Sequence, residues 1–350
     1  MSEMQELVKR VFEEWLKENK GDFSGVFSAS GTDGIIFQHA CGYRNIAEKL
    51  PNTPDTIFGI ASGTKLFTGL SICKLIDEKK LSLEDKLNNL LPYDLGQVNK
   101  DITVYHLLTH TSGVGDYIDE EADDCEEQLQ KLYDTYPVQL WIRLEYYLQM
   151  ITPLPPKFAP GERYGYSNSG YILLGLVVEA VSGLPFQKFV EDVIITPSGL
   201  TDTGFYRADS LPAGAALGYD KDDDSGGWRT NVFSLPVIGG SDGGIYTCAG
   251  DLDKLWRFVI SNKLLSEEMT NAFLKSYVAT DEEDDEETYG LGVYHYKTDG
   301  KLVHFAVGGD SGVGFCTAYY PKTGAVMSCF VNTGWMGFYD LIGELLEVLG

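Results

Sequence analysis

The chain has 350 residues, enough to bury a large core in one or two domains. Hydrophobic residues make up 43% and charged residues 23%, a balance typical of a globular protein and not of a disordered one. The net charge of −25 argues against nucleic acid and anionic membrane as partners, because both carry negative charge themselves.

The first part of the chain predicts a helix, a hairpin and a second helix. Apolar residues recur at helical spacing over residues 4–19. Two alternating runs at residues 23–30 and 34–42 predict strands, joined by a tight turn over residues 31–34. Apolar side chains then occur on several sides of the segment that begins at Ser62, which is typical of a buried central helix.

The rest of the chain divides into a helical stretch and a strand-rich stretch. The expected helices are 104–108, 127–133, 139–149, 168–181, 251–262 and 339–349, and the expected late strands are 203–206, 289–293, 302–307, 312–320 and 325–331. This order predicts an α+β fold with an antiparallel β-sheet flanked by N- and C-terminal helices. The sheet domain would comprise residues 1–78 and 201–350, and residues 79–200 would form an inserted, mostly helical domain.

Targeting signals and cysteine usage indicate the compartment. No apolar run approaches the roughly 18–20 residues that a membrane helix needs, and the start of the chain is acidic where a signal peptide is basic. The six cysteines are scattered, as is typical of reduced thiols in the cell. We therefore expect a cytoplasmic protein in which Cys316 and Cys329 face each other across a hairpin without a bond. Three acidic runs are expected to be solvated loops, at residues 119–127, 222–224 and 281–287.

Ser62 and Lys65 form the first candidate for chemistry. Residues three apart lie on the same side of a helix, so a hydroxyl nucleophile and an amine base would be neighbours. A serine in the first turn also lies near unpaired backbone N–H groups and the positive end of the helix dipole. The spacing alone has little specificity, since Ser71 and Lys74 repeat it.

Tyr166 and Asn168 form the second candidate. A phenol can give or take a proton when a nearby ammonium lowers its pKa. An asparagine two residues further on can donate to a substrate carbonyl and also hold the lysine. The segment from Tyr43 to Asn45 has the same spacing, so in isolation a core tyrosine and a turn asparagine explain the pattern better.

The surrounding strings carry a resemblance that decides between these readings. They are Pro-Asn-Thr-Pro-Asp-Thr-Ile-Phe-Gly-Ile-Ala-Ser-Gly-Thr-Lys at residues 51–65, Leu-Leu-Thr-His-Thr-Ser-Gly at 107–113, Pro-Gly-Glu-Arg-Tyr-Gly-Tyr-Ser-Asn-Ser-Gly-Tyr at 160–171, Thr-Pro-Ser-Gly-Leu-Thr-Asp-Thr at 196–203 and Gly-Gly-Ser-Asp-Gly-Gly-Ile-Tyr-Thr-Cys-Ala-Gly-Asp at 239–251. In this order they closely resemble the serine β-lactamase-related family, which includes class C β-lactamases, D-alanyl-D-alanine carboxypeptidases, D-aminopeptidases and carboxylesterases. The resemblance extends from about residue 23 to the end.

The resemblance implies a role for each candidate residue. Ser62 is similar in position to the family nucleophile, and Lys65 to the lysine that activates it. Tyr166 matches the tyrosine thought to act as general base and then general acid, and Asn168 matches the asparagine that orients substrate and lysine. Because the identity of the base is disputed for related enzymes, we assign it to the Lys65–Tyr166 pair. The backbone N–H of Ser62 is expected to form half of the oxyanion hole.

The family's third element is a strand triad, Lys-Thr-Gly or His-x-Gly, and here the chain departs from the pattern. A literal Lys-Thr-Gly at residues 322–324 lies in an expected turn between two strands. The place of the triad, ahead of Gly314-Phe315, is held by Val307, Gly308 and Gly309. Val307 would thus replace the cation, and the second oxyanion donor would be the backbone N–H of Asp310. A register shift of one residue stays open in this glycine-rich stretch.

The missing cation shapes the functional prediction. A charge-assisted contact to a substrate carboxylate is worth about 1.5–3 kcal/mol, and penicillins and peptidoglycan stems carry such a carboxylate. A simple ester leaves no group unpaired, and some carboxylesterases of the family likewise have a bulky apolar residue there. We therefore predict a serine hydrolase that acts on small carboxylic esters or amides through a Ser62 acyl-enzyme, with no metal and no cofactor. A D,D-carboxypeptidase or β-lactamase is the first alternative, and a non-catalytic binding domain the second.

Three other patterns are rejected as sites. Ser241 lies in a G-x-S-x-G string, but no helix follows it at once as the nucleophile elbow of α/β-hydrolases requires. Ser311 and His39 resemble parts of trypsin-like proteases, but the long helices argue against an all-β double barrel. His106 and His110 are four residues apart, yet no third zinc ligand stands out. We expect a structural role for His110.

Overall fold

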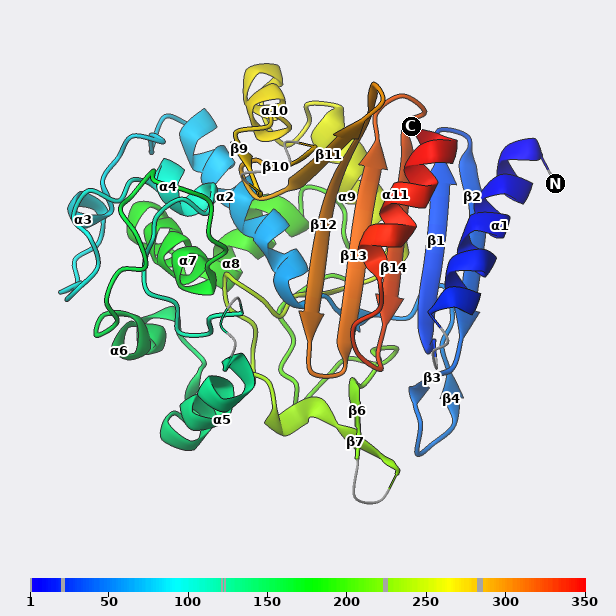
Figure 1. Cartoon of the computed structure of the whole chain (residues 1–350), viewed down its shortest axis with the longest axis horizontal. Coiled ribbons are helices and arrows are strands. Elements are labelled where there is room, and N and C mark those ends of the chain that lie inside the picture. Colours follow the sequence, from blue (N-terminus) through cyan, green and yellow to red (C-terminus); the bar gives the residue numbers. More distant parts are fainter. Residues whose placement is uncertain (1, 20–22, 121, 123, 223–225, 282–285) are drawn as a thin grey trace.

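The structure, a computed structural model, describes residues 2–19, 23–120, 122, 124–222, 226–281 and 286–350. Its centre is an eight-stranded antiparallel sheet in the order β2-β1-β14-β13-β12-β11-β10-β9. α1 (Glu3–Glu18) and α11 (Phe338–Leu349) pack together on one face of this sheet, and α9 (Ala249–Ile260) packs on the other (Figure 1). The predicted α+β class with an antiparallel sheet is confirmed.

The large sheet combines strands from both ends of the chain. β1 (Gly25–Gly31) and β2 (Gly34–Cys41) form the predicted hairpin, and β1 also pairs with β14 (Ala325–Val331). The remaining strands of this sheet are β9 (Val278–Ala279), β10 (Glu287–Tyr289), β11 (Tyr294–Thr298), β12 (Lys301–Asp310) and β13 (Val313–Tyr320). Three small pairs complete the strands of the described chain: β3 (Tyr43–Asn45) with β4 (Leu50–Pro51), β5 (Phe58–Gly59) with β8 (Tyr246–Thr247), and β6 (Tyr219–Lys221) with β7 (Trp228–Thr230).

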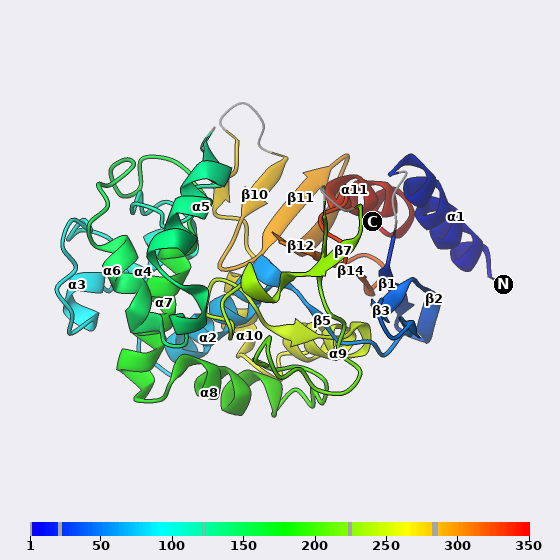
Figure 2. The same ribbon diagram turned by 90° about the horizontal axis from the view of Figure 1, so that it is seen from below.

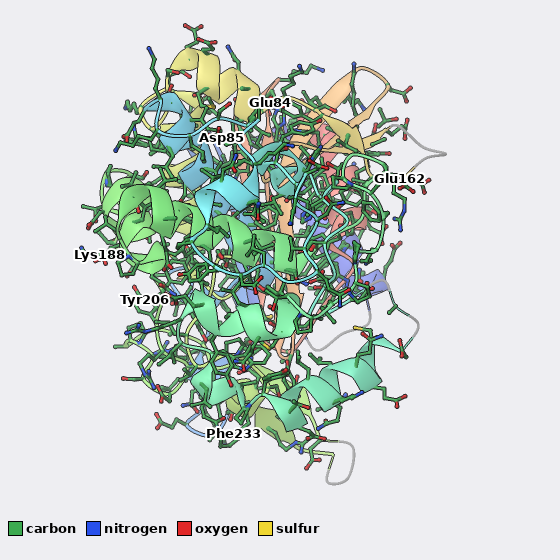
Figure 3. All side chains as sticks on the ribbon, turned by 90° about the vertical axis from the view of Figure 1, so that its left-hand side faces the viewer. Glu84, Asp85, Glu162, Lys188, Tyr206 and Phe233 are labelled. Atoms are coloured by element: carbon green, nitrogen blue, oxygen red, sulfur yellow. The ribbon has the colours of Figure 1, made fainter. Side chains whose placement is uncertain are left out.

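A helical region stands at one end of the sheet, and α1 lies at the other (Figure 2). It is organised around α2 (Thr64–Asp77) and α7 (Asn168–Ser182), which pack against each other. The other helices of the described chain are α3 (Leu87–Leu90), α4 (Val104–Leu108), α5 (Cys125–Thr135), α6 (Leu148–Ile151), α8 (Phe186–Val190) and α10 (Glu267–Phe273). Figure 3 views this region from its outer side, where the exposed Glu84, Glu162 and Lys188 are labelled.

Two hydrophobic cores explain these layers. The larger core lies between the sheet and the helical region, and α2 and α7 are buried in it along most of their length. The smaller core joins α1 and α11 to the opposite face of the sheet, with Phe12 and Trp15 fully buried. α2 belongs to the predicted sheet domain and α7 to the predicted helical insert, yet both are buried in the same larger core. The division into domains at residues 78 and 200 therefore stays a prediction.

Some elements differ from their sequence expectations. The expected helix 139–149 consists of two 3-10 turns, Val138–Leu140 and Leu144–Tyr147, followed by the short α6. The expected strand 203–206 contributes only an isolated bridge between Gly204 and Tyr246. β11 and α10 had not been expected, although the Tyr-His-Tyr-Lys-Thr of β11 contains two tyrosines and a threonine, which favour strands. Parts of the three acidic runs, at residues 121, 123, 223–224 and 282–285, lie outside the described residues.

The hairpin formed by β13 and β14 bears on two predictions. Cys316 pairs directly with Cys329 across these strands, and both thiols are free. The literal Lys-Thr-Gly at 322–324 is the turn between them, as expected, and the backbone N–H of Gly324 donates to the carbonyl of Tyr320.

Among the described residues, no single helix is both long and apolar enough to cross a membrane, although α7 and residues 186–195 together pass on length and composition as a bent pair.

Candidate active site

Ser62 lies in a tight turn at the entrance to α2. The 3-10 turn Ala61–Gly63 precedes the helix, and Ala61 has a φ of 43°, a left-handed conformation that is unfavourable for a residue with a side chain. A Cβ added to Gly63 would lie 2.3 Å from the ring of Phe315, so glycine is needed for the turn to approach the sheet. The turn leaves Ser62 half-buried between α2 and the sheet.

Lys65 is buried one helical turn after Ser62, with 3% of its surface exposed. Its Nζ donates to Ser62 Oγ at 2.9 Å, to Asn168 Oδ1 at 2.7 Å and to the carbonyl oxygen of Asp242 at 2.8 Å. These three acceptors match the three N–H bonds of an ammonium. Burial nevertheless lowers the pKa of Lys65 from its ordinary 10.5, although nearby carboxylates oppose the shift. The amine therefore loses its proton more readily than a free lysine does.

Tyr166 approaches Ser62 from the segment before α7. Its O–H donates to Ser62 Oγ at 2.8 Å, so the serine oxygen receives hydrogen bonds from both the amine and the phenol. Lys65 Nζ also lies 4.8 Å from the centroid of the Tyr166 ring. Burial raises the pKa of Tyr166 well above its ordinary value, with a smaller contribution from the charge of Glu120. In the resting site the tyrosine is thus a neutral phenol, able to give a proton.

Asn168 begins α7 and is anchored by two carboxylates that sequence reasoning missed. Its backbone N–H donates to Asp116 at 2.8 Å, and its side-chain amide donates to Glu120 at 2.7 Å, which leaves Oδ1 for Lys65. Asp116 also accepts the backbone N–H of Ser169 at 2.8 Å. A carboxylate at a helix N-terminus satisfies otherwise unpaired N–H groups. The polar segment directly after the 107–113 string could have indicated such a role.

His110 supports the second motif from beneath, in agreement with the structural role expected for it. Its Nδ1 accepts the backbone N–H of Ser167 at 3.1 Å, and its ring centroid lies 4.7 Å from that of Tyr166 and 4.9 Å from that of Tyr171. His106 instead belongs to the N-terminal cap of α4, where its Nδ1 accepts the backbone N–H of Thr103. The two histidines therefore serve separate structural roles.

The loop 239–244, whose serine had been rejected as a nucleophile, contributes to the site through its backbone. The carbonyl of Ser241 accepts the Thr68 hydroxyl at 2.6 Å, and the next carbonyl, that of Asp242, is the third acceptor of Lys65. The buried carboxylate of Asp242 accepts the hydroxyl of Tyr117. The glycine-rich string had been recognised as part of the resemblance, but its carbonyl contact to the lysine follows only from the folded loop.

The third motif lies on the last residues of β12. A Cβ added to Gly308 would lie 2.1 Å from the carbonyl oxygen of Ile60 and 2.9 Å from the backbone nitrogen of Ser62, so the strand contacts the nucleophile turn here. Side chains alternate along a strand, and Ala306 therefore shares the face of Gly308 while Val307 faces the other way. Ala306 belongs to the core beside α2, whereas Val307 packs against the core of α1 and α11. Neither position carries a cation.

Two cavities meet at Ser62. The larger, about 980 Å³, includes Lys65 and Tyr166 in its lining, and the smaller, about 290 Å³, includes Asn168 and Asp242. Residues that line both are Ser62, Glu120, Gly309 and Asp310. Among the described lining residues Lys65 is the only cation, whereas five acidic residues line one or both cavities: Glu120, Asp242, Asp281, Glu287 and Asp310.

A serine that accepts hydrogen bonds from a buried lysine and a tyrosine, beside an antiparallel sheet, defines the serine hydrolases of the β-lactamase fold. Residues 8–339 match the family described as Beta-lactamase, and the chain belongs to that family.

Several known proteins are similar to this chain in sequence or structure. The chain is 32% identical to the "Penicillin-binding protein 4*" of Bacillus subtilis over an aligned stretch of 188 residues, which makes up 54% of this chain and 39% of that protein. The crystal structure of a penicillin-binding protein from Bacillus halodurans superposes with a TM-score of 0.87 at 39% identity, covering 97% of this chain and 99% of that one. A D-stereospecific amidohydrolase from a Streptomyces species has a TM-score of 0.81 at 24% identity, over 97% of each chain, and shows the likeness of fold alone. The chain spans only about two-fifths of the length of the first curated relatives that it matches.

Proposed function

We propose that this protein hydrolyses small carboxylic esters or amides through an acyl-enzyme on Ser62. The observation that carries the proposal is the double hydrogen bond to Ser62 Oγ, from Lys65 Nζ at 2.9 Å and from Tyr166 O–H at 2.8 Å. A nucleophile within hydrogen-bond reach of a base, with the base oriented by a third group, is the signature of covalent catalysis. Asn168 and the carbonyl of Asp242 supply that orientation.

Acylation uses both neighbours of the serine. The neutral form of Lys65, made accessible by its lowered pKa, takes the Ser62 proton as Oγ bonds to the substrate carbonyl carbon. Tyr166 gives its proton to the leaving oxygen or nitrogen as that bond to carbon breaks, and it regains a proton from the lysine. In the second step the same pair takes a proton from water, which attacks the ester to Ser62, releases the acid and restores the hydroxyl. No metal and no cofactor enters this sequence.

The register of β12 favours Gly309 over Asp310 as the second oxyanion donor. Asp310 and Val313 close a two-residue turn, and Thr298 and Lys301 close another at the far end of the strand, with no register shift between. Closing pairs of such turns are hydrogen-bonded to each other, and the direction of the backbone N–H alternates along a strand. Both ends therefore direct the N–H of Asp310 towards β13 and that of Gly309 towards the open edge beside Ser62. The original assignment to Asp310 stays untested, and we propose Gly309 in its place.

The charges around the site support neutral or cationic substrates. A substrate carboxylate would meet Glu120 and Asp310 at the junction of the two cavities, and neither Ala306 nor Val307 of β12 offers a cation to receive it. Burial raises the pKa of Asp310 to about 7, so the repulsion is strongest above that pH. Like charges at close range are unfavourable where water is excluded. The family's Lys or His would stand at Ala306 or Val307, and both residues are apolar, so the register does not alter this conclusion. The partner in this proposal is a small molecule.

A D,D-carboxypeptidase or β-lactamase is the second candidate, favoured by the names of the relatives. The turnover rates of two substrates distinguish this candidate from the ester or amide hydrolase that we propose. One substrate is nitrocefin, a cephalosporin with a carboxylate, and the other is 4-nitrophenyl acetate. We expect the ester to be turned over and nitrocefin to acylate Ser62 slowly or not at all. Comparable rates on both would replace our proposal with this candidate.

The proposal is tested by covalent labelling. A fluorophosphonate probe should label the wild-type protein and not Ser62→Ala, while Ser71→Ala, in the second string of the same spacing, should be labelled like the wild type. Ser71 donates its hydroxyl to the carbonyl of Phe67 inside α2 and faces neither cavity, which makes it a matched control. Failure to label the wild type would instead support a non-catalytic binding domain.

A further inference from the structure

We infer that the smaller cavity receives the acyl side of the substrate and selects a compact apolar group, either a single aromatic ring or a short branched chain. The inference rests on the proposed function, since it uses the roles given to Ser62 and Tyr166. It adds the direction in which the substrate lies and the chemical class of its acyl group.

The position of the proton donor sets the direction of the substrate. Tyr166, which protonates the leaving group, lines the larger cavity and is absent from the lining of the smaller one. The leaving atom must lie within hydrogen-bond reach of the phenol, so the leaving group extends into the larger cavity. Ser62 attacks the carbon between the two halves of the substrate. The acyl group therefore extends to the opposite side, past Asn168, into the smaller cavity.

The walls of the smaller cavity are aromatic. Six rings line it, together with aliphatic side chains: Tyr117, Tyr133, Trp141, Tyr147, Tyr206 and Tyr246, with Ile118, Leu129, Leu235 and Val313. They come from α5, from the segments before and after it, from the chain around Tyr206, from residues 235–246 and, for Val313, from the start of β13. Tyr206 is labelled on this side of the molecule in Figure 3.

The polar ends of several of these rings already have protein partners. The Tyr117 hydroxyl donates to Asp242, the Tyr133 hydroxyl to the carbonyl of Ser234 at 2.9 Å, and the Trp141 indole to the carbonyl of Tyr136 at 3.1 Å. Their ring surfaces remain to contact a guest. Aromatic walls favour an apolar guest, and above all another ring, because offset or edge-to-face ring pairs add to the gain from burial.

Size narrows the class further. About 290 Å³ is at the small end of the range of ligand pockets. Leu129 and Tyr133 of α5 form part of the wall, so a long alkyl chain could enter only by displacing that helix. A ring or a short branched chain fits without such a change.

The test compares two esters with one leaving group, 4-nitrophenyl phenylacetate and 4-nitrophenyl acetate. Leu129→Trp should fill the cavity and lower kcat/KM for the phenylacetate by about tenfold or more relative to the acetate, the size of effect that steric changes in apolar pockets produce. Gln130→Trp, the next residue of α5, is exposed and outside the cavity, and it should leave the ratio unchanged. Leu129→Ala should enlarge the cavity and raise kcat/KM for a bulkier ester, 4-nitrophenyl 2-naphthoate, relative to that for 4-nitrophenyl acetate.

Each outcome has a separate meaning. An unchanged phenylacetate-to-acetate ratio in Leu129→Trp, together with an unchanged naphthoate-to-acetate ratio in Leu129→Ala and wild-type melting temperatures in both, would overturn the inference while leaving Ser62 chemistry intact. A Leu129→Trp effect that follows the size of the leaving group, measured with a series of acetate esters, would reverse the assigned direction and also overturn it. Failure of the proposed function is distinct, because wild-type protein would then neither hydrolyse 4-nitrophenyl acetate nor react with the fluorophosphonate.

Discussion

The helical corner around Ser62 and the strand β12 contribute to the site in different ways. The corner contributes side chains: the amine of Lys65 on α2, the phenol of Tyr166 just before α7 and the amide of Asn168 at the start of α7, which hydrogen bonds join to Ser62 or to one another. β12 contributes backbone and shape: two glycines, the first of which lies against the nucleophile turn. In the proposed function, the first region carries the chemistry, and the second holds the oxyanion and selects the charge of the substrate.

Removal of the amine should have the largest effect. Lys65→Ala leaves Ser62 without its base, and we expect kcat for 4-nitrophenyl acetate to fall by about 10⁴-fold or more, as for other nucleophile–base units. Lys74→Ala is the matched control, because Lys74 has the same spacing from Ser71 but pairs with Glu78 at the surface. Equal loss in both variants would show that the motif was assigned wrongly.

A methyl group on Gly308 should have the next largest effect. Its Cβ would lie 2.1 Å from the carbonyl oxygen of Ile60 and 2.9 Å from the backbone nitrogen of Ser62. Because both of these atoms belong to the backbone and cannot rotate away, β12 would have to move away from Ser62. We expect Gly308→Ala to lower kcat by about 10²–10³-fold, the cost of losing one oxyanion donor, with labelling of Ser62 slowed in parallel. Gly343→Ala in α11, where nothing lies within 4 Å of the new Cβ, is the control and should keep full activity. Full activity of Gly308→Ala would contradict the close approach of the strand.

The pH profile should sharpen the same comparison. Because burial lowers the pKa of Lys65, kcat/KM should rise with pH along a limb whose apparent pKa lies below 10.5. Glu120→Gln removes a charge that holds this pKa up, so the limb should move to lower pH. Glu162→Gln, on the exposed surface labelled in Figure 3, should not move it. A limb that moves upward in Glu120→Gln would exclude Lys65 as the titrating base.

The smallest expected effect concerns the stability of the β11–β12 pair. His295 and His304 face each other across these strands with their Nδ1 atoms 2.6 Å apart, and burial lowers their pKa values to about 3 and about 4. Unfolded histidines take up protons below about 6.5, so the unfolded state gains protons first and stability falls as pH decreases from about 6.5 to about 4. The melting temperature should decrease over this window, and less steeply in the double variant His295→Gln, His304→Gln. Equal slopes in the two proteins would show that the pair does not contribute.

The contrast between the two regions also explains what the sequence could predict. Ser62, Lys65, Tyr166 and Asn168 were singled out by the order of the surrounding strings and the family resemblance that these carry, since each spacing recurs elsewhere in the chain. Hydrogen bonds join the four side chains in the structure. The register of β12 was left open because side-chain direction on a strand changes with every residue, and only the two flanking turns fix it. Asp116, Glu120 and Asp242 were missed, since their contacts depend on loops whose path no local pattern records.

The order of strands in the sheet has a consequence for how the protein is made. β1 pairs with β14, and the strand beside the nucleophile, β12, is synthesised long after Ser62. Until the last strands emerge, the β1–β2 hairpin exposes an unpaired edge, and such edges invite association with other chains. Ser62 also lacks its contact with β12 over the same interval. In the proposed function, a growing chain therefore cannot yet hydrolyse an ester, and its open strand edge is covered only when β14 pairs with β1.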